Sequence, residues 1–255
     1  MMHMKYDYYN HTNVFKPGYN VQIGVNNGYI AYSYISPDVN DMKTAIPFLE
    51  GYRRQFQDYP KTVVTDAGYG SYGNYAYAQL HQIQAILKYS GYQKKKEKVT
   101  EKNQFQLLHM KRNEKGVPVC PQGYDFEAEK VTVDMKSGLP RTTIHYRNQH
   151  CEGCPLRSRC TTSKKGRSAR ISPQLEKYQK QVDAVLETEE GREFIAQRSS
   201  QAEGAFADIK KNFGYSLLRR RGESGVKVEL GLVILGYNLR HYHQRKMKTN
   251  PDTMN

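Results

Sequence analysis

The feature that most constrains the fold is a short run of alternating apolar residues that ends in an Asn-Gly turn. Apolar side chains recur at every second position over residues 19–25, and this period of two is typical of a β-strand. Asn26-Asn27-Gly28 follows, and these residue types tolerate the positive φ angles that a tight hairpin turn needs. Residues 29–35 are therefore predicted to form the returning strand.

Helix and strand patterns alternate after this hairpin. Apolar residues at helical spacing predict a helix over residues 42–56, with Pro37, Asp38 and Asn40 as helix-start residues. A short β-branched strand is predicted at 61–66, a helix at 72–83 and a brief strand at 85–87. This order predicts an α/β fold.

Two acidic residues are candidates for metal-dependent chemistry on phosphate esters. Asp66 ends the predicted strand and precedes Ala-Gly-Tyr-Gly, while Glu203 lies in a helix predicted from Thr188 to about residue 213. Mg²⁺ prefers oxygen ligands, and two-metal phosphoryl transfer needs carboxylates. The alternative is a turn-forming Asp and an ordinary helical Glu, and spacing alone favours that alternative.

All four cysteines fall in one segment of different composition, residues 89–165. Cys151 and Cys154 form a Cys-x₂-Cys pair, Cys160 follows, and Cys120 lies in a turn-rich Cys-Pro-Gln-Gly. Four thiolates fit a closed, structural Zn²⁺ site, which is favoured over two disulfides in a reducing compartment. Reduced cysteines without a metal are the alternative.

The charge of the chain favours a polyanionic partner. The sequence has 39 Lys and Arg against 25 Asp and Glu, a net charge of +14, and phosphate contacts release counterions. Arg219, Arg220 and Arg221 beside a glycine turn are phosphate-binding candidates, with a solvated turn as the alternative. Tyr69, Tyr72 and Tyr75 could stack on bases or pack as half-buried residues. No apolar run approaches the ~18–20 residues of a membrane span, and the absence of a signal-peptide pattern predicts a cytoplasmic protein.

Six ordered blocks, spanning residues 16–242, carry a family resemblance. They are YNVQIGV, VVTDAGYGSYGNY, CPQG, CEGCPLRSRC, RSSQAEGAFADIKKNFGYSLLRRRG and LGLVILGYNLR. In this order they resemble the DDE insertion-sequence transposases that carry a cysteine-bearing insertion before the catalytic glutamate.

The resemblance implies an RNase H-like catalytic domain that uses two Mg²⁺ ions. Asp66 matches the second catalytic acid and Glu203 the last one. Lys210 follows Glu203 with six residues between them, which places both on one face of an α-helix, two turns apart. Arg198 and Lys210 are then expected to contact DNA; an ordinary basic helix face is the alternative for both.

The sequence departs from the family pattern at its beginning. The family's first catalytic Asp lies on a first strand, upstream of the YNVQ block, and nothing before Lys16 has that pattern. Asp7 lacks an apolar strand around it, and Asp41 is better explained as a helix-start residue. We therefore expect an amino-terminally truncated chain without that acid, in which two strand edges face each other unpaired.

The sequence as a whole predicts an RNase H-like mixed sheet with flanking helices, interrupted by a small β insertion. Residues 1–88 and 166–247 are expected to form the core, 89–165 the cysteine-bearing insertion and 248–255 a tail. The expected function is DNA transposition by metal-dependent strand cleavage and transfer, with DNA, and with a second copy of the chain, as partners. No membrane or small-molecule partner is expected. A catalytically inactive DNA-binding remnant and an RNase H-like nuclease remain alternatives.

Overall fold

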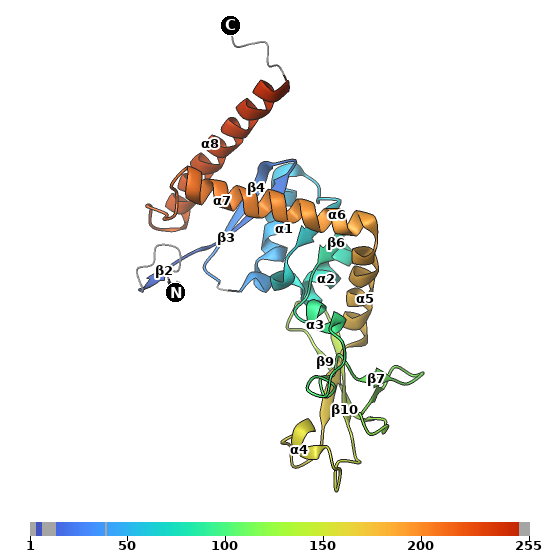
Figure 1. Cartoon of the computed structure of the whole chain (residues 1–255). Helices are drawn as coiled ribbons and strands as arrows, with labels where there is room; N and C mark the ends of the chain where they lie inside the picture. The colour runs from blue at the N-terminus through green and yellow to red at the C-terminus, as the bar shows by residue number, and fades with distance from the viewer. Residues whose placement is uncertain (1–3, 7–13, 39, 250–255) are drawn as a thin grey trace.

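The computed structural model describes residues 4–6, 14–38 and 40–249, and it has three parts (Figure 1). A body of helices and short strands carries a β-rich extension on one side, and a long carboxyl-terminal helix, α8, projects from the other. The fold is mixed α/β, as predicted. No helix of the described residues combines the length and apolar character that crossing a membrane requires.

The predicted hairpin is confirmed. β3 (Asn20–Asn26) and β4 (Tyr29–Ser36) pair antiparallel, with Asn26 opposite Tyr29 at the turn. Asn27 and Gly28 both have positive φ angles, 51° and 80°, which is the backbone that a two-residue hairpin turn requires. A shorter antiparallel pair, β1 (Met4–Tyr6) and β2 (Phe15–Pro17), precedes it.

A second unit is built from two parallel strands and the helix between them. The 3₁₀ helix η1 (Asp41–Lys43) and helix α1 (Ala45–Phe56) lead into β5 (Thr62–Thr65). The 3₁₀ turn η2 (Ala67–Tyr69) and helix α2 (Tyr72–Leu80) then return the chain to β6 (Gln84–Leu87), which pairs with β5 in parallel. The Ser71 hydroxyl accepts a hydrogen bond from the backbone N–H of Asn74 and so caps α2.

The two units do not form the single mixed sheet that the sequence predicts. β3 and β4 are one two-stranded sheet, β5 and β6 another, and no strand of the described residues joins them. The buried apolar residues of the body accordingly fall into separate clusters, one around α2, β6 and α5 and others around β3, β4 and α8.

The extension forms its own small fold. It contains α3 (Tyr92–Lys96), β7 (Lys111–Arg112), β8 (Pro118–Val119), β9 (Glu127–Asp134), β10 (Arg141–Arg147), α4 (Arg157–Cys160) and β11 (Ser168–Ile171). β10 lies between β9 and β11 in an antiparallel sheet. Phe126, Tyr146 and Ile171 are among the buried residues of its core. β11 belongs to this sheet although it follows residue 165, the predicted end of the insertion.

The rest of the chain is helical. α5 (Pro173–Glu187) is followed by α6 (Glu189–Arg198), which begins at the Thr188 cap. The helix continues through the π-turn η3 (Ser199–Glu203), α7 (Gly204–Ala207) and a second π-turn, η4 (Asp208–Asn212). α8 (Glu223–Thr249) buries Val226, Leu230 and Tyr237 against the body.

Candidate active site

Asp66 lies where the sequence placed it, directly after β5. Its Oδ1 accepts a hydrogen bond from the backbone N–H of Gly68 at 2.9 Å, so the carboxylate caps the turn η2. A Cβ atom on Gly68 would lie 3.1 Å from Asp66 Oδ1 and 3.2 Å from Asp41 Oδ2. The glycine therefore leaves room between two carboxylates that a larger residue would crowd.

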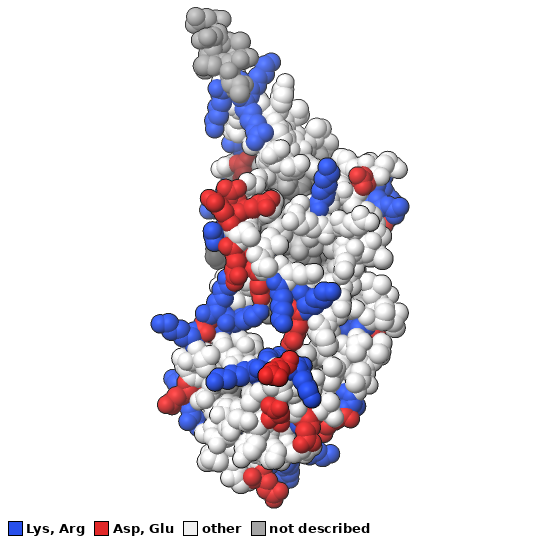
Figure 2. All heavy atoms as spheres, turned by 90° about the vertical axis from the view of Figure 1, so that its right-hand side faces the viewer, with Lys and Arg blue, Asp and Glu red and all other residues white. Residues whose placement is uncertain are grey.

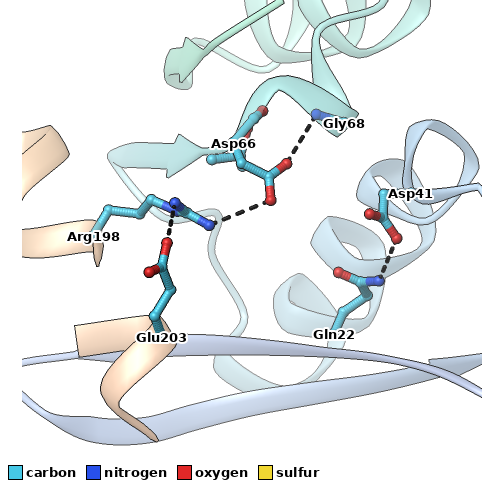
Figure 3. Close-up of polar contacts among 7 residues, drawn as sticks. Gln22, Asp41, Asp66, Gly68, Arg198 and Glu203 are labelled. Carbon is cyan, nitrogen blue, oxygen red and sulfur yellow. Dashed lines mark hydrogen bonds and ion pairs between the residues drawn. The ribbon is translucent and has the colours of Figure 1, made fainter. Parts of the chain in front are cut away.

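Arg198 joins the two predicted acids, which are far apart in the sequence. Its Nη2 donates to Asp66 Oδ2 at 3.3 Å, and its Nη1 donates to Glu203 Oε1 at 2.9 Å (Figure 3). The Arg198 side chain is 23% exposed, whereas those of Asp66 and Glu203 are 47% and 61% exposed. One half-buried guanidinium thus holds two partly exposed carboxylates.

The turn geometry around Glu203 differs from the regular α-helix assumed for the sequence. Glu203 ends the π-turn η3, and Lys210 lies within the second π-turn, η4. A π-turn closes with i→i+5 hydrogen bonds, so it shifts the angular position of every residue that follows. π-turns of this kind are often found at functional sites.

Asp41 accepts side-chain hydrogen bonds that the sequence did not indicate. It is the first residue of η1, but the cap is Asn40, whose side chain accepts from the backbone N–H of Met42. Asp41 Oδ1 instead accepts hydrogen bonds from the side-chain amides of Asn20 and Gln22, at 2.6 and 3.1 Å. Both amides come from the beginning of β3, so Asp41 ties this strand to the loop beside Asp66.

Tyr69 completes this side of the site. Burial raises its pKa well above the usual value, and the nearby carboxylates of Asp41 and Asp66 raise it further. The phenol therefore stays neutral at physiological pH and can act as a hydrogen-bond donor. Of the three tyrosines for which base stacking and packing were both considered, Tyr72 and Tyr75 are buried, at 8% and 4% exposure, so packing is confirmed for these two.

In a comparison with protein families, a stretch in the second half of the chain matches a known family. Residues 119–243 match the family described as "Transposase DDE domain". The chain carries a transposase DDE domain. No curated protein and no solved structure matches the chain. The matched residues include Arg198 and Glu203, and they begin after Asp66.

The other basic candidates of the DDE domain lie apart from this cluster or on its rim. The Lys210 ammonium lies over the ring of Phe206, 5.7 Å from its centre. Arg219, Arg220 and Arg221 are exposed, in the loop before α8. The hydrogen bonds of their backbone to Glu229, rather than a contact with Asp66 or Glu203, hold this loop in place among the described residues.

Glu229 is a buried acid that the sequence analysis missed. It is 7% exposed and accepts hydrogen bonds from the backbone N–H groups of Arg219 and Arg220, at 2.7 and 2.8 Å, and from the Tyr215 hydroxyl. It therefore fixes the backbone of the arginine loop. A single Glu among the mostly apolar residues 226–235 was the signal that could have indicated it.

The structure does not show the predicted zinc site. Cys120, Cys151, Cys154 and Cys160 are free and half-buried. Burial raises the pKa of the Cys160 thiol, Arg167 lowers it, and the other three cysteines raise it, so the four lie in one region. Among the described residues, however, no three His, Cys, Asp or Glu side chains are placed to hold a metal ion.

Proposed function

We propose that this chain acts in DNA transposition, with Asp66 and Glu203 as ligands of a divalent cation and Arg198 as the basic residue between them. The observation that carries the proposal is that one guanidinium binds two carboxylates from segments 137 positions apart in the sequence (203 − 66). The DDE domain gives DNA as the partner. We further propose that the two sheets and their helices correspond to the RNase H-like fold of this family.

The two carboxylates suit Mg²⁺ in number and kind. Mg²⁺ is usually bound by one or two protein carboxylates together with water and substrate phosphates. Asp66 and Glu203 supply oxygen ligands that are about half exposed, which leaves space for hydration and for a DNA phosphate. Such an ion would supply Lewis-acid stabilisation of a phosphoryl group.

Arg198 has two roles in this arrangement. It neutralises the repulsion between the two acids, which would otherwise disfavour their approach. Its planar fork of N–H donors also fits phosphate oxygens better than a lysine would. We therefore assign Arg198 to charge balance between the acids before a cation binds and to contact with the DNA backbone.

Basic side chains suited to DNA lie away from the acids as well. Figure 2 shows Lys and Arg gathered at the carboxyl-terminal end of α8, beside the grey residues, while acidic and basic side chains are mixed on the rest of this face. The last turns of α8 carry Arg245, Lys246 and Lys248. Together with the arginine loop at 219–221, they could follow a phosphate backbone without reading its sequence.

An exposed apolar stripe on α8 supports a homodimer. Val228, Leu232, Leu235, Leu239 and Tyr242 are 55% to 65% exposed, and they recur at intervals of four, three, four and three. This is the spacing of a coiled-coil seam, whose side chains fit a helix with the same repeat. A second copy of α8 carries that repeat, so we propose that two chains pair along it.

The proposed activity is tested on supercoiled plasmid DNA with Mg²⁺ or Mn²⁺ and the full chain. Wild type is compared with Asp66→Asn, Glu203→Gln and the control Glu193→Gln, which replaces an exposed Glu of α6. We expect strand cleavage and joining by wild type and the control, with a loss of at least about 100-fold in both acid variants.

The outcomes separate the three candidate functions. Joined products that depend on both acids support transposition. Cleavage without joining would show a nuclease, and DNA binding without cleavage would show an inactive remnant; either result overturns the catalytic proposal. Cleavage that survives both substitutions would exclude Asp66 and Glu203 as the site.

A further inference from the structure

The outer strand of the extension, β9, has an open edge. It pairs with β10 on one side, and no strand of the described residues pairs with it on the other. Seven of its eight residues are exposed. Every second residue of such an edge points its backbone N–H and C=O groups outwards, where another strand can bind them. The extension lies on the side of the body opposite α8 (Figure 1), so this edge is separate from the apolar stripe of α8.

One row of apolar side chains crosses the sheet and ends at this edge. Ile171 of β11, Ile144 of β10 and Val131 of β9 lie opposite one another. Ile171 is buried, at 5% exposure, and Ile144 packs against the core of the extension. Val131, however, is 60% exposed, and Val133, the next residue on the same face, is 62% exposed. The apolar face of the sheet therefore continues beyond the residues that cover it.

The sequence of β9 is complementary to itself when two copies run antiparallel. Residues 130–134 read Lys-Val-Thr-Val-Asp, with a basic residue at one end and an acidic residue at the other. If Thr132 lies on a two-fold axis, Lys130 of each copy faces Asp134 of the other, and Val131 faces Val133. Opposite charges and β-branched side chains in directly opposite positions stabilise antiparallel strands.

Neighbouring registers of the same pair match less well. Directly opposite side chains point to the same face of a sheet, so two identical antiparallel strands pair with one residue on the two-fold axis. An axis at Val133 would place Lys130 opposite Lys136 of the other copy, where like charges repel. An axis at Val131 would place the Glu129 carboxylate opposite Val133. Of the three registers, only the central one matches charge with charge and valine with valine.

We propose that the open edge of β9 is a self-association surface, on which β9 of a second copy pairs antiparallel about Thr132. The two three-stranded sheets then form one six-stranded sheet, and the exposed valines of both copies pack together on one of its faces. Five residues from each copy bury less than the roughly 1,200 Å² of a stable complex, so the pairing is transient in dilute solution. It is distinct from the proposed pairing along α8 and does not rest on the transposition function.

The proposal is tested by disulfide crosslinking at the axis. Directly opposite Cα atoms of antiparallel strands are about 4.5–5.5 Å apart, a distance that a disulfide bridges. Thr132→Cys is compared with Thr142→Cys, at another exposed threonine of the same sheet, on β10 rather than on the edge strand. Both variants are made in the full chain that also carries Leu232→Glu and Leu239→Glu, so that association along α8 does not contribute.

The rate of crosslinking is measured on non-reducing gels at high protein concentration, with copper phenanthroline as the oxidant. The parent chain, whose four native cysteines are half-buried, gives the background. We expect the crosslinked dimer to form about tenfold faster for Thr132→Cys than for Thr142→Cys, because only the first places two thiols within bridging distance. Equal rates, or no rate above the background, would leave the edge to a strand of a different protein and overturn the proposal.

A charge exchange checks the register. In the Thr132→Cys chain, Lys130→Asp places two acids opposite each other and Asp134→Lys places two bases there, so each should slow crosslinking about threefold. The two changes together restore opposite charges and should restore the rate. If the double variant stays as slow as the single ones, these residues do not face each other and the proposed pairing fails. None of these readouts requires DNA.

Discussion

At the scale of single residues, the buried carboxylate of Glu229 fixes the arginine loop. Burial by itself raises the pKa of Glu229, but hydrogen bonds from Tyr215 and from the backbone of Arg220 and Arg219 outweigh it and hold the pKa below its usual value. Because the folded-state pKa is lowered, the stabilisation is fully present above the ordinary Glu pKa of about 4.3. It is lost as the pH falls through the lower folded-state value.

Glu229→Gln should therefore destabilise the chain by about 1–3 kcal/mol at neutral pH, because the amide N–H₂ group would replace one of the two oxygens that now accept from backbone N–H groups. The measurement is urea unfolding at several pH values. The difference from wild type should shrink below pH 4. Glu223→Gln, on the exposed start of the same helix, should cost less than about 0.5 kcal/mol; an equal cost for both variants would contradict this role.

Arg198 competes with a cation for the same two carboxylates. Removing it in Arg198→Ala should strengthen Mn²⁺ binding about threefold to tenfold, because the pairs with Asp66 and Glu203 are partly exposed and each contributes at most about 1 kcal/mol. The same variant should weaken DNA binding. Titration calorimetry measures both. Arg192→Ala, in the same helix and bonded to the Glu187 backbone carbonyl, should change neither, and weaker Mn²⁺ binding by Arg198→Ala would contradict the competition.

At the scale of whole elements, α8 shows what a helical pattern in the sequence can and cannot predict. Its apolar residues recur at helical spacing, and the segment is a helix. The residues at 228, 232, 235 and 239, however, face solvent, and Val226, Leu230 and Tyr237 make the contact with the body. Two faces of α8 carry apolar residues. The spacing of these residues does not indicate which of the two faces packs against the β3–β4 hairpin.

The exposed stripe of α8 predicts a dimer that charge can disrupt. Leu232→Glu with Leu239→Glu places four acidic side chains along the proposed seam of the pair, and like charges so close disfavour association. We expect a dimer for wild type and a monomer for the double variant in sedimentation velocity. Leu80→Glu, at an equally exposed leucine of α2 (64%), is the control and should remain dimeric. A monomeric wild type would contradict the pairing.

At the scale of the whole molecule, local patterns predicted the elements better than they predicted their assembly. The hairpin, α1, β5, α2 and β6 follow from periodicity and turn residues. The contact of Asp66 with Arg198 spans 132 positions, and no local pattern encodes it. The π-turns of the helix around Glu203 have no sequence signature in this chain, and the separation of β3 and β4 from β5 and β6 into two sheets was not predicted by the pattern of any one strand.

The charge of the whole molecule predicts how its DNA binding responds to salt. Each phosphate contact lowers the slope of log K against log salt concentration by about 0.9 on duplex DNA. If Arg219, Arg220 and Arg221 contact phosphates, replacing all three by Ala should make the slope shallower by about 2–3, independently of DNA sequence. Fluorescence anisotropy with a labelled duplex at several salt concentrations measures this.

The matched control removes the same charge from the extension. Lys111, Lys115 and Lys130 are exposed there, and their replacement by Ala lowers the net charge from +14 to +11 (14 − 3), as the arginine variant does. If the net charge of the whole chain alone governed DNA binding, both triple variants would make the slope of log K against log salt concentration shallower by the same amount. A larger loss for the arginine variant would instead place the DNA on the loop that Glu229 holds in position.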